Sequence, residues 1–199
     1  MWHLHVALTF NSLNTACFSV IRFGGQPGAG QPVSHCFGLV PGLEVPGVQG
    51  ILNAYAAALP VIHLSGPTLF APVLSAAVAR AQHNLANLKA GQPLVYTILL
   101  IITDGVINDM PATQALLNQA AGLPLSVIIV GVGEADFSQM NALDGDDAPR
   151  KQSGARDIVQ VRKSTWNPLC LTLQFPSHPS IPLFRFLLYH TVCSPKRIS

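Results

Sequence analysis

One apolar run limits the possible folds of this chain more than any other feature. Leu94–Ile102 is interrupted only by the polar side chains of Tyr96 and Thr97, and it ends at a turn signal, residues 103–105, which read Thr-Asp-Gly. A short apolar run that contains several β-branched residues and ends at such a turn is typical of a strand that is buried on both faces. The sequence therefore predicts a buried strand over Leu94–Ile102.

A second apolar run, Leu125–Val132, follows after a helical segment. That segment has Asp109 as a candidate N-cap, Pro111 in its first turn and Gly122 just beyond its end, which are the usual positions of these residue types. The order strand, helix, strand predicts a βαβ unit with a right-handed crossover. We therefore expect the two apolar runs to be adjacent, central strands of a mostly parallel sheet.

Asp104 draws attention because it comes directly after the first of these strands. In open parallel sheets, ligands bind at the edge formed by the carboxyl ends of the strands. A carboxylate at this place can be a metal ligand, an acid or base in catalysis, or a cap for the next helix. For an isolated aspartate the capping role is favoured, and the pattern by itself leaves all three open.

Composition restricts the possible classes of protein. The chain has 199 residues, enough for one domain with a core, and it is 49% apolar and 10% charged. Its formal net charge of +2 argues against strong attraction to nucleic acid or to an anionic membrane. The four cysteines form no C-x-x-C pair, so they suit free thiols in a reducing compartment such as the cytoplasm.

The remaining elements follow from periodicity and from turn residues. Glycines crowd residues 24–30 without the ending of a phosphate-binding loop, so a flexible turn is expected there. The expected strands are Ala16–Phe23, Val33–Val40, Val61–Leu64 and Ala155–Gln160, and the expected helices are Val48–Leu59, Phe70–Leu88 and Phe137–Leu143. No apolar run is long enough to predict a membrane-spanning helix.

Motifs of common enzymes are missing from the sequence. There is no G-x-S-x-G, no H-E-x-x-H and no nucleotide-binding loop, so we do not expect an enzyme. Asp144, Asp146 and Asp147 resemble a calcium loop only superficially, because Ala148 and Pro149 break the required spacing. A solvated acidic turn is the favoured interpretation of these three residues.

Taken together, several motifs resemble the von Willebrand factor A-like domain of the copine family. The resemblance covers residues 33–160. It rests on VSHCF at residues 33–37, GPT at 66–68, LLIITDGVI at 99–107, LPLSVIIVGVG at 123–133, ADFS at 135–138, LDGDD at 143–147 and ARDIVQ at 155–160. The resemblance implies a doubly wound α/β domain of Rossmann type, with helices on both faces of the sheet and a metal-ion-dependent adhesion site on its carboxyl edge.

In the family pattern, three loops hold the divalent ion of this adhesion site. One loop supplies Asp-x-Ser/Thr-x-Ser, the second a threonine and the third an aspartate. Thr68 matches the second and Asp104 the third, and hard oxygen ligands of this kind suit Mg²⁺ or Ca²⁺. No acidic residue precedes Glu44, so the first loop is expected to be missing together with the first strand and helix. Two oxygen ligands would hold an ion only weakly.

The resemblance also implies a division of the chain and a function. Residues 1–32 are expected to be a poorly defined N-terminal segment, 33–160 a partial copine-type A domain, and 161–199 a tail outside the family pattern. In copines, two C2 domains ahead of this domain bind phospholipid in a calcium-dependent way, and this chain has neither. The implied function is protein binding in the cytoplasm, with plasma-membrane association only through C2 domains. The alternative is a truncated or alternatively spliced product without a competent metal or partner site.

Overall fold

The computed structural model describes residues 5–11, 14–40, 42, 44–133, 135–144 and 156–163. Its strands are β1 (His5–Asn11), β2 (Asn14–Arg22), β3 (Gly25–Gln26), β4 (Phe37–Gly38), β5 (Val45–Pro46), β6 (His63–Leu64), β7 (Thr97–Thr103), β8 (Leu125–Gly131) and β9 (Val159–Lys163). Its helices are α1 (Gly47–Ala58), α2 (Ala71–Ala86), α3 (Met110–Ala120) and the 3₁₀ helix η1 (Ser138–Leu143). None of the helices in these ranges is long and apolar enough to cross a membrane.

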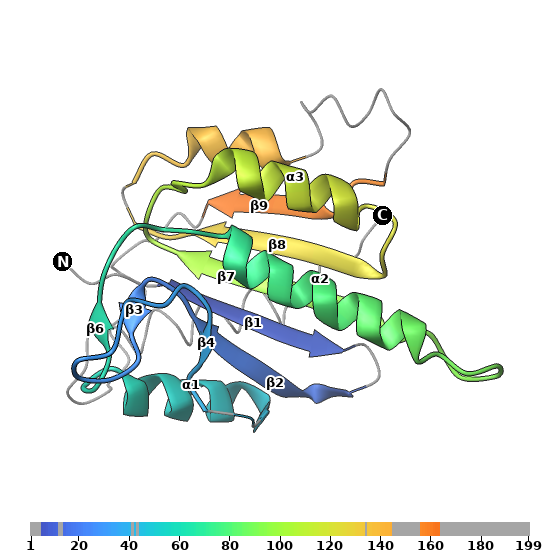
Figure 1. Ribbon diagram of the computed structural model, residues 1–199, viewed down its shortest axis with the longest axis horizontal. Coiled ribbons are helices and arrows are strands. Elements are labelled where there is room, and N and C mark those ends of the chain that lie inside the picture. The colour runs from blue at the N-terminus through green and yellow to red at the C-terminus, as the bar shows by residue number, and fades with distance from the viewer. Residues whose placement is uncertain are drawn as a thin grey trace, which may run out of the picture.

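The centre of the main sheet is the predicted βαβ unit (Figure 1). β7 pairs in parallel with β8 from Thr97 opposite Leu125 to Thr103 opposite Gly131, and β8 pairs in parallel with β9. The strand order is β4-β2-β1-β7-β8-β9. The α/β class and the central, adjacent position of the two apolar runs are therefore confirmed.

The N-terminal strands extend the main sheet. β1 and β2 both fall within the range 1–32 that the sequence did not assign to the domain, and β1 lies between β2 and β7 and pairs antiparallel with both. Val6 and Leu8 are buried in the core on one side of β1, and Ala7 is buried in the core on the other. Only two residues separate β1 from β2 in the sequence. The sequence did not indicate this antiparallel pair, because no glycine or proline stands between the two strands.

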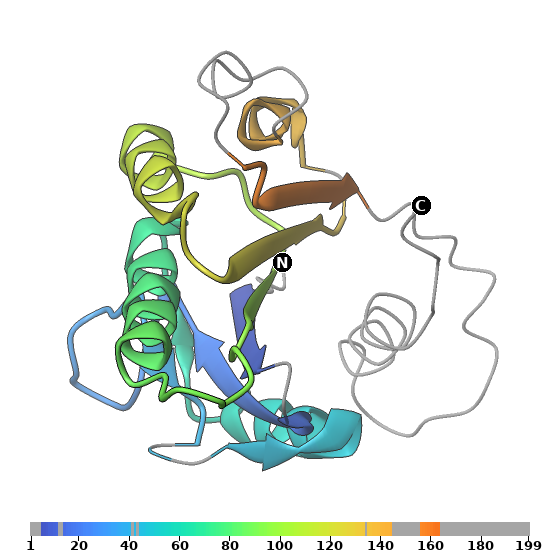
Figure 2. The same ribbon diagram turned by 90° about the vertical axis from the view of Figure 1, so that its right-hand side faces the viewer.

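Helices cover both faces of the sheet. α2, α3 and η1 bury one face through a core that includes Leu74, Leu117 and Met140, which pack with Ile101 of β7. α1 buries the other face at β1 and β2, where its Ile51 belongs to the second core. Figure 2 shows α2 and α3 together on one side of the sheet and α1 at the end formed by β2. This arrangement confirms the predicted helices on two faces.

The last strand differs from its predicted range. β9 comprises Val159–Lys163, whereas the sequence predicted Ala155–Gln160, and the strand therefore crosses the expected domain boundary at residue 160. Its start is set by Asp157, whose Oδ1 accepts a hydrogen bond from the Val159 N–H at 3.1 Å. The expectation that residues 161–199 form a poorly packed tail concerns, beyond residue 163, residues outside the described ranges.

Candidate functional site at the carboxyl edge of the sheet

Thr68 belongs to the loop before α2 and Asp104 to the loop after β7, and hydrogen bonds join these two loops. The Asn108 N–H donates to the Thr68 carbonyl at 2.9 Å, and the Thr68 N–H donates to Oδ1 of Asn108 at 2.8 Å. These two hydrogen bonds fasten the loop before α2 to the loop after β7. We call residues 65–70, 103–109, 131–133 and 135–137 the carboxyl rim.

Asp109 strengthens this connection in a way that the sequence did not reveal. It is the residue before α3, as expected for an N-cap, but its side chain makes no capping bond to that helix backbone. Instead, its carboxylate accepts hydrogen bonds from the N–H groups of Phe70 and Ala71, at 2.9 and 2.8 Å, and from the Thr113 hydroxyl at 3.3 Å. Asp109 therefore caps the N-terminus of α2, which lies beside α3.

Asp104 is half-buried at the end of β7. Its negative charge and the guanidinium of Arg22 both act on the phenol of Tyr55 in α1. Burial is the main cause that raises the pKa of Tyr55, and the negative charge of Asp104 acts in the same direction. The positive charge of Arg22 and its hydrogen bond to Tyr55 act in the opposite direction and lower this pKa. Arg22 itself is 1% exposed. The rim therefore has a buried positive charge close to its central carboxylate.

This donor set does not fit a tightly held divalent ion. Mg²⁺ and Ca²⁺ need several oxygen ligands, usually with more than one carboxylate. Within the described ranges, no group of three or more His, Cys, Asp and Glu residues lies close enough to hold a metal ion. The Asp109 carboxylate is already engaged by α2, and Asp136 is exposed and accepts the Ser138 N–H at 2.9 Å. Thr68 and Asp104 remain the two predicted donors, and Arg22 adds a positive charge nearby.

Asp136 also lies on the rim, in the segment between β8 and η1. Its hydrogen bonds from Ser138 are the main cause that lowers its pKa, and the positive charge of Lys163 adds a smaller contribution in the same direction. Such bonds are typical of a turn that starts a helix, and here they start η1. We therefore interpret Asp136 as a local cap.

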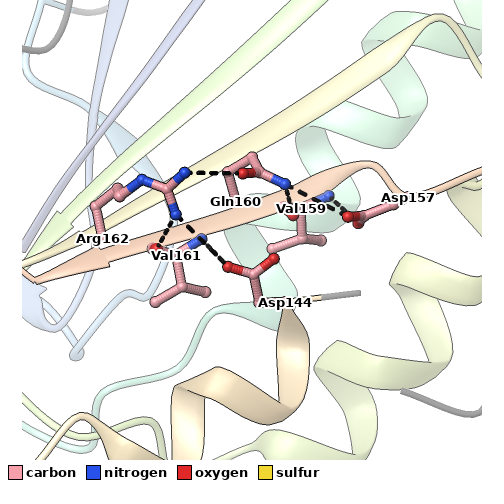
Figure 3. A network of polar contacts seen from close by, with 6 residues as sticks. All are labelled: Asp144, Asp157, Val159, Gln160, Val161 and Arg162. Carbon is pink, nitrogen blue, oxygen red and sulfur yellow. Dashed lines mark hydrogen bonds and ion pairs between the residues drawn. The ribbon is translucent and has the colours of Figure 1, made fainter. Parts of the chain in front are cut away.

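Asp144, the residue after η1, supports β9 (Figure 3). Oδ2 of Asp144 accepts the Val161 N–H at 3.1 Å and lies 3.9 Å from Nη1 of Arg162. The Arg162 guanidinium also donates to Oε1 of Gln160 at 3.2 Å. Asp144 is thus not a solvated residue of an acidic turn, because it holds the edge of β9; Asp146 and Asp147 lie outside the described residues.

In the part of the chain that the structure describes, cavities also occur away from the rim. One, of about 320 Å³, is lined by Ser19, Val20, Ile21, Gly38, Val40, Gly42, Glu44 and Arg80. The other, of about 250 Å³, lies between α1 and β4 and is mostly apolar. In the first, Nη1 of Arg80 donates to the Ser19 hydroxyl at 2.8 Å, and Nη2 is paired with Glu44. Neither cavity contains Thr68 or Asp104.

Arg22 of β2 and Tyr55 of α1 lie beside the rim, and the sequence patterns did not point to either of them. The available signal was the spacing in β2, where Phe18 and Val20 alternate into the core beneath α1 and Arg22 continues that alternation. An arginine in step with buried apolar residues predicts a buried charge with a partner. Tyr55 carries no comparable signal, because a tyrosine on an apolar helix face is usual in a core.

Comparisons with known proteins cover most of the described chain. The family model described as Copine matches residues 5–165, a wider range than the motifs alone indicated. Two relatives from Arabidopsis thaliana, Protein BONZAI 2 and Protein BONZAI 1, are each 47% identical to the chain over 151 residues. Each alignment covers 72% of this chain and 25% of the relative, so the chain spans about a quarter of the length of these relatives.

Proposed function

Because the chain belongs to the copine family, we propose that it acts as a non-enzymatic protein-binding module of the von Willebrand factor A type. We assign the binding surface to the carboxyl rim. In this proposal the module works in the cytoplasm, and any attachment to the plasma membrane, with its response to calcium, comes from the phospholipid-binding C2 domains of the family. Nucleic acid is not among the proposed partners.

The observation that carries this proposal is the rigidity of the rim. The loop before α2 and the loop after β7 are fixed to each other by both backbone groups of Thr68 and by the carboxylate of Asp109. Because these loops are already ordered, a partner would not have to order them on binding, and less free energy would be lost. Gly66, Pro67 and Asn108 are exposed on this surface and are available for contact.

The proposed binding surface is the rim and does not include the cavities described above. Neither cavity brings an acid or base together with a nucleophile that is free to react, since in the larger one Ser19 and Glu44 are both occupied by Arg80. A rigid edge formed by loops, without such a group, suits recognition of a protein surface better than a chemical reaction.

The test is a comparison of partners between two variants. Gly66→Arg places a long charged side chain on the exposed rim, where nothing lies within 4 Å of an added Cβ atom, and Lys89→Glu changes a charge on the exposed turn after α2, at the opposite end of the sheet. Partners recovered with the wild-type chain, and quantified by mass spectrometry, should be lost with Gly66→Arg and kept with Lys89→Glu. Circular dichroism must show that both variants remain folded.

Two results would contradict the proposal. Equal loss of partners in both variants would place the surface elsewhere. Failure of the wild-type chain to retain any protein above an unrelated folded domain would favour the alternative, a truncated product without a competent partner site.

A further inference from the structure

The buried guanidinium of Arg22 lies beside the rim, and an anionic group must compensate for the hydration that its positive charge has lost. Arg22 is the last residue of β2 and is 1% exposed, and its guanidinium carbon lies 5.9 Å from the centre of the Tyr55 ring. A guanidinium can be removed from water only where hydrogen bonds and an opposite charge compensate for the lost hydration. The aromatic ring supplies a part of this compensation. A carboxylate is the group expected to supply most of it.

The strand register brings Asp104 near this charge. Arg22 is paired with Val6 of β1, and Val6 is paired with Ile102 of β7. Two strand spacings separate Arg22 from Ile102, which is about 10 Å between backbones. Asp104 comes two residues after Ile102, where the chain leaves the strand. A long arginine side chain can cover most of this distance beneath α1.

Other described carboxylates have different roles. Glu44 is paired with Arg80 on the opposite face of the sheet, and Asp109 caps α2. Asp144 lies against Arg162 and β9. Asp104, in contrast, is the carboxylate among the described residues whose charge acts on Tyr55, the same phenol on which Arg22 acts. The two charges therefore belong to one cluster.

We propose that Arg22 is the permanent counter-ion of Asp104 and that it takes the place of a divalent cation at this edge of the sheet. The rim is then neutralised by a side chain of the chain itself, and its structure does not depend on a metal ion. A divalent cation beside Asp104 would meet a fixed positive charge, and the unfavourable interaction would weaken its binding. This inference concerns the rim itself and holds whether or not the proposed protein binding is correct.

The first test uses the wild-type chain. A ligand that binds only the folded state raises the melting temperature. We expect the same melting temperature in EDTA and in millimolar MgCl₂, CaCl₂ or MnCl₂, and no binding of Mn²⁺ at micromolar concentration by electron paramagnetic resonance. A melting temperature that rises with any of these ions, or micromolar Mn²⁺ binding, would overturn the inference.

The second test is a double-mutant cycle with Arg22→Met, Asp104→Asn and the double variant. Each single change leaves one charge without its partner, whereas the double change removes both. We expect the double variant to be more stable than the sum of the single effects predicts, by about tenfold in the unfolding equilibrium constant, within the range for residues in contact. Additive single effects would overturn the inference.

The matched control is another arginine–carboxylate pair, Arg80 and Glu44, whose side chains are 30% and 38% exposed. A cycle with Arg80→Met and Glu44→Gln should give a smaller coupling, because solvent screens exposed pairs. A coupling at Arg22–Asp104 no larger than at Arg80–Glu44 would contradict the proposal. If Arg22→Met does not fold, the neutral Arg22→Gln replaces it in the cycle, and the metal titration of the wild-type chain still decides.

Discussion

At the scale of single residues, Asp109 connects two helices through one carboxylate. It accepts the N–H groups of Phe70 and Ala71 at the start of α2 and the hydroxyl of Thr113 in α3. Those N–H groups have no acceptor within α2, because the first N–H groups of a helix lack intrahelical partners. The residue therefore supports the packing of α2 on α3 and the position of Thr68 at the same time.

We predict that Asp109→Ala lowers the free energy of unfolding by about 1–2 kcal/mol, the usual loss for an N-cap. The measurement is urea denaturation followed by circular dichroism, with an unchanged m-value as evidence for the same extent of unfolding. Asp136→Ala is the matched control, because Asp136 is exposed and accepts local hydrogen bonds from Ser138. An equal loss in both variants would show that Asp109 does not hold α2.

Cys36 provides a prediction about pH. It is half-buried in the loop before β4, and burial raises the pKa of its thiol because the thiolate is the less favourable form away from water. The thiolate is the form that reacts with iodoacetamide. At neutral pH, Cys36 should therefore be alkylated more slowly in the folded chain than in urea, and its rate should rise at a higher pH when folded.

The measurement for Cys36 is peptide mass spectrometry of the alkylated chain over a series of pH values. The same cysteine in urea is the reference, so no second residue is needed for comparison. Superimposable pH profiles in the two states would contradict the raised pKa.

At this scale, the sequence predicts positions better than partners. It indicated neighbouring loops for Thr68 and Asp104, and the hydrogen bonds between Thr68 and Asn108 join those loops. It missed Arg22, because its partner Asp104 is far away in the sequence and only strand register brings the two together. It also assigned Asp109 to its own helix, since capping patterns are local and the bond to α2 spans 38 and 39 residues.

At the scale of elements, the contact between β8 and η1 depends on a glycine. Gly131 is the last residue of β8, and a Cβ atom added there would lie 2.8 Å from ring atoms of Phe137. Real Cβ atoms do not approach other atoms so closely, and Phe137 is buried and cannot move away freely. The absence of a side chain at Gly131 therefore lets the loop before η1 fold back on the sheet.

We predict that Gly131→Ala destabilises the chain by about 1–3 kcal/mol, the cost typical of overpacking in a core. Phe137→Leu should reduce this loss when it is combined with Gly131→Ala, so that the two changes are not additive in the free energy of unfolding. Gly122→Ala is the control, since nothing lies within 4 Å of a Cβ atom at Gly122. If Gly131→Ala and Gly122→Ala have the same stability, the close contact does not exist.

Periodicity predicted the elements of the C-terminal half well, because β7 and β8 are continuous apolar runs and α3 has clear end signals. It could not predict how β1 runs. A buried strand has the same pattern of residues whether its neighbours are parallel or antiparallel. β1 runs antiparallel to β2 because two residues are too few for the crossover that a parallel pair would require.

At the scale of the whole molecule, the sheet has a core on each face. The core beneath α1 explains why the fold extends beyond residues 33–160, the range in which the sequence motifs resemble the family. The core beneath α1 includes Val6, Leu8, Phe18 and Val20, which all precede that range. Without them, Ile51 and Tyr55 of α1 would lose their main apolar contacts. The family match from residue 5 agrees with this physical requirement.

The positions of the carboxylates and the net charge of the chain determine whether it can bind a membrane in a calcium-dependent way. Calcium bridges a protein to anionic lipid when several carboxylates hold the ion and leave positions for lipid oxygens. The described part of the chain has no cluster of three such groups. The formal net charge of +2 gives only a weak attraction to anionic lipid, which ions at physiological strength screen over about 8 Å.

We therefore predict that the chain does not sediment with anionic phospholipid vesicles in a calcium-dependent way. Vesicles containing phosphatidylserine are mixed with the chain at physiological salt, in Ca²⁺ or in EGTA, and the pelleted fraction should be the same in both. At low salt a small fraction should pellet in both conditions, because attraction to a positive chain needs no calcium. An isolated C2 domain, sedimented in parallel, shows that the vesicles are competent. A pelleted fraction that rises with Ca²⁺ at physiological salt would refute the assignment of lipid binding to C2 domains and would place a calcium site in this chain.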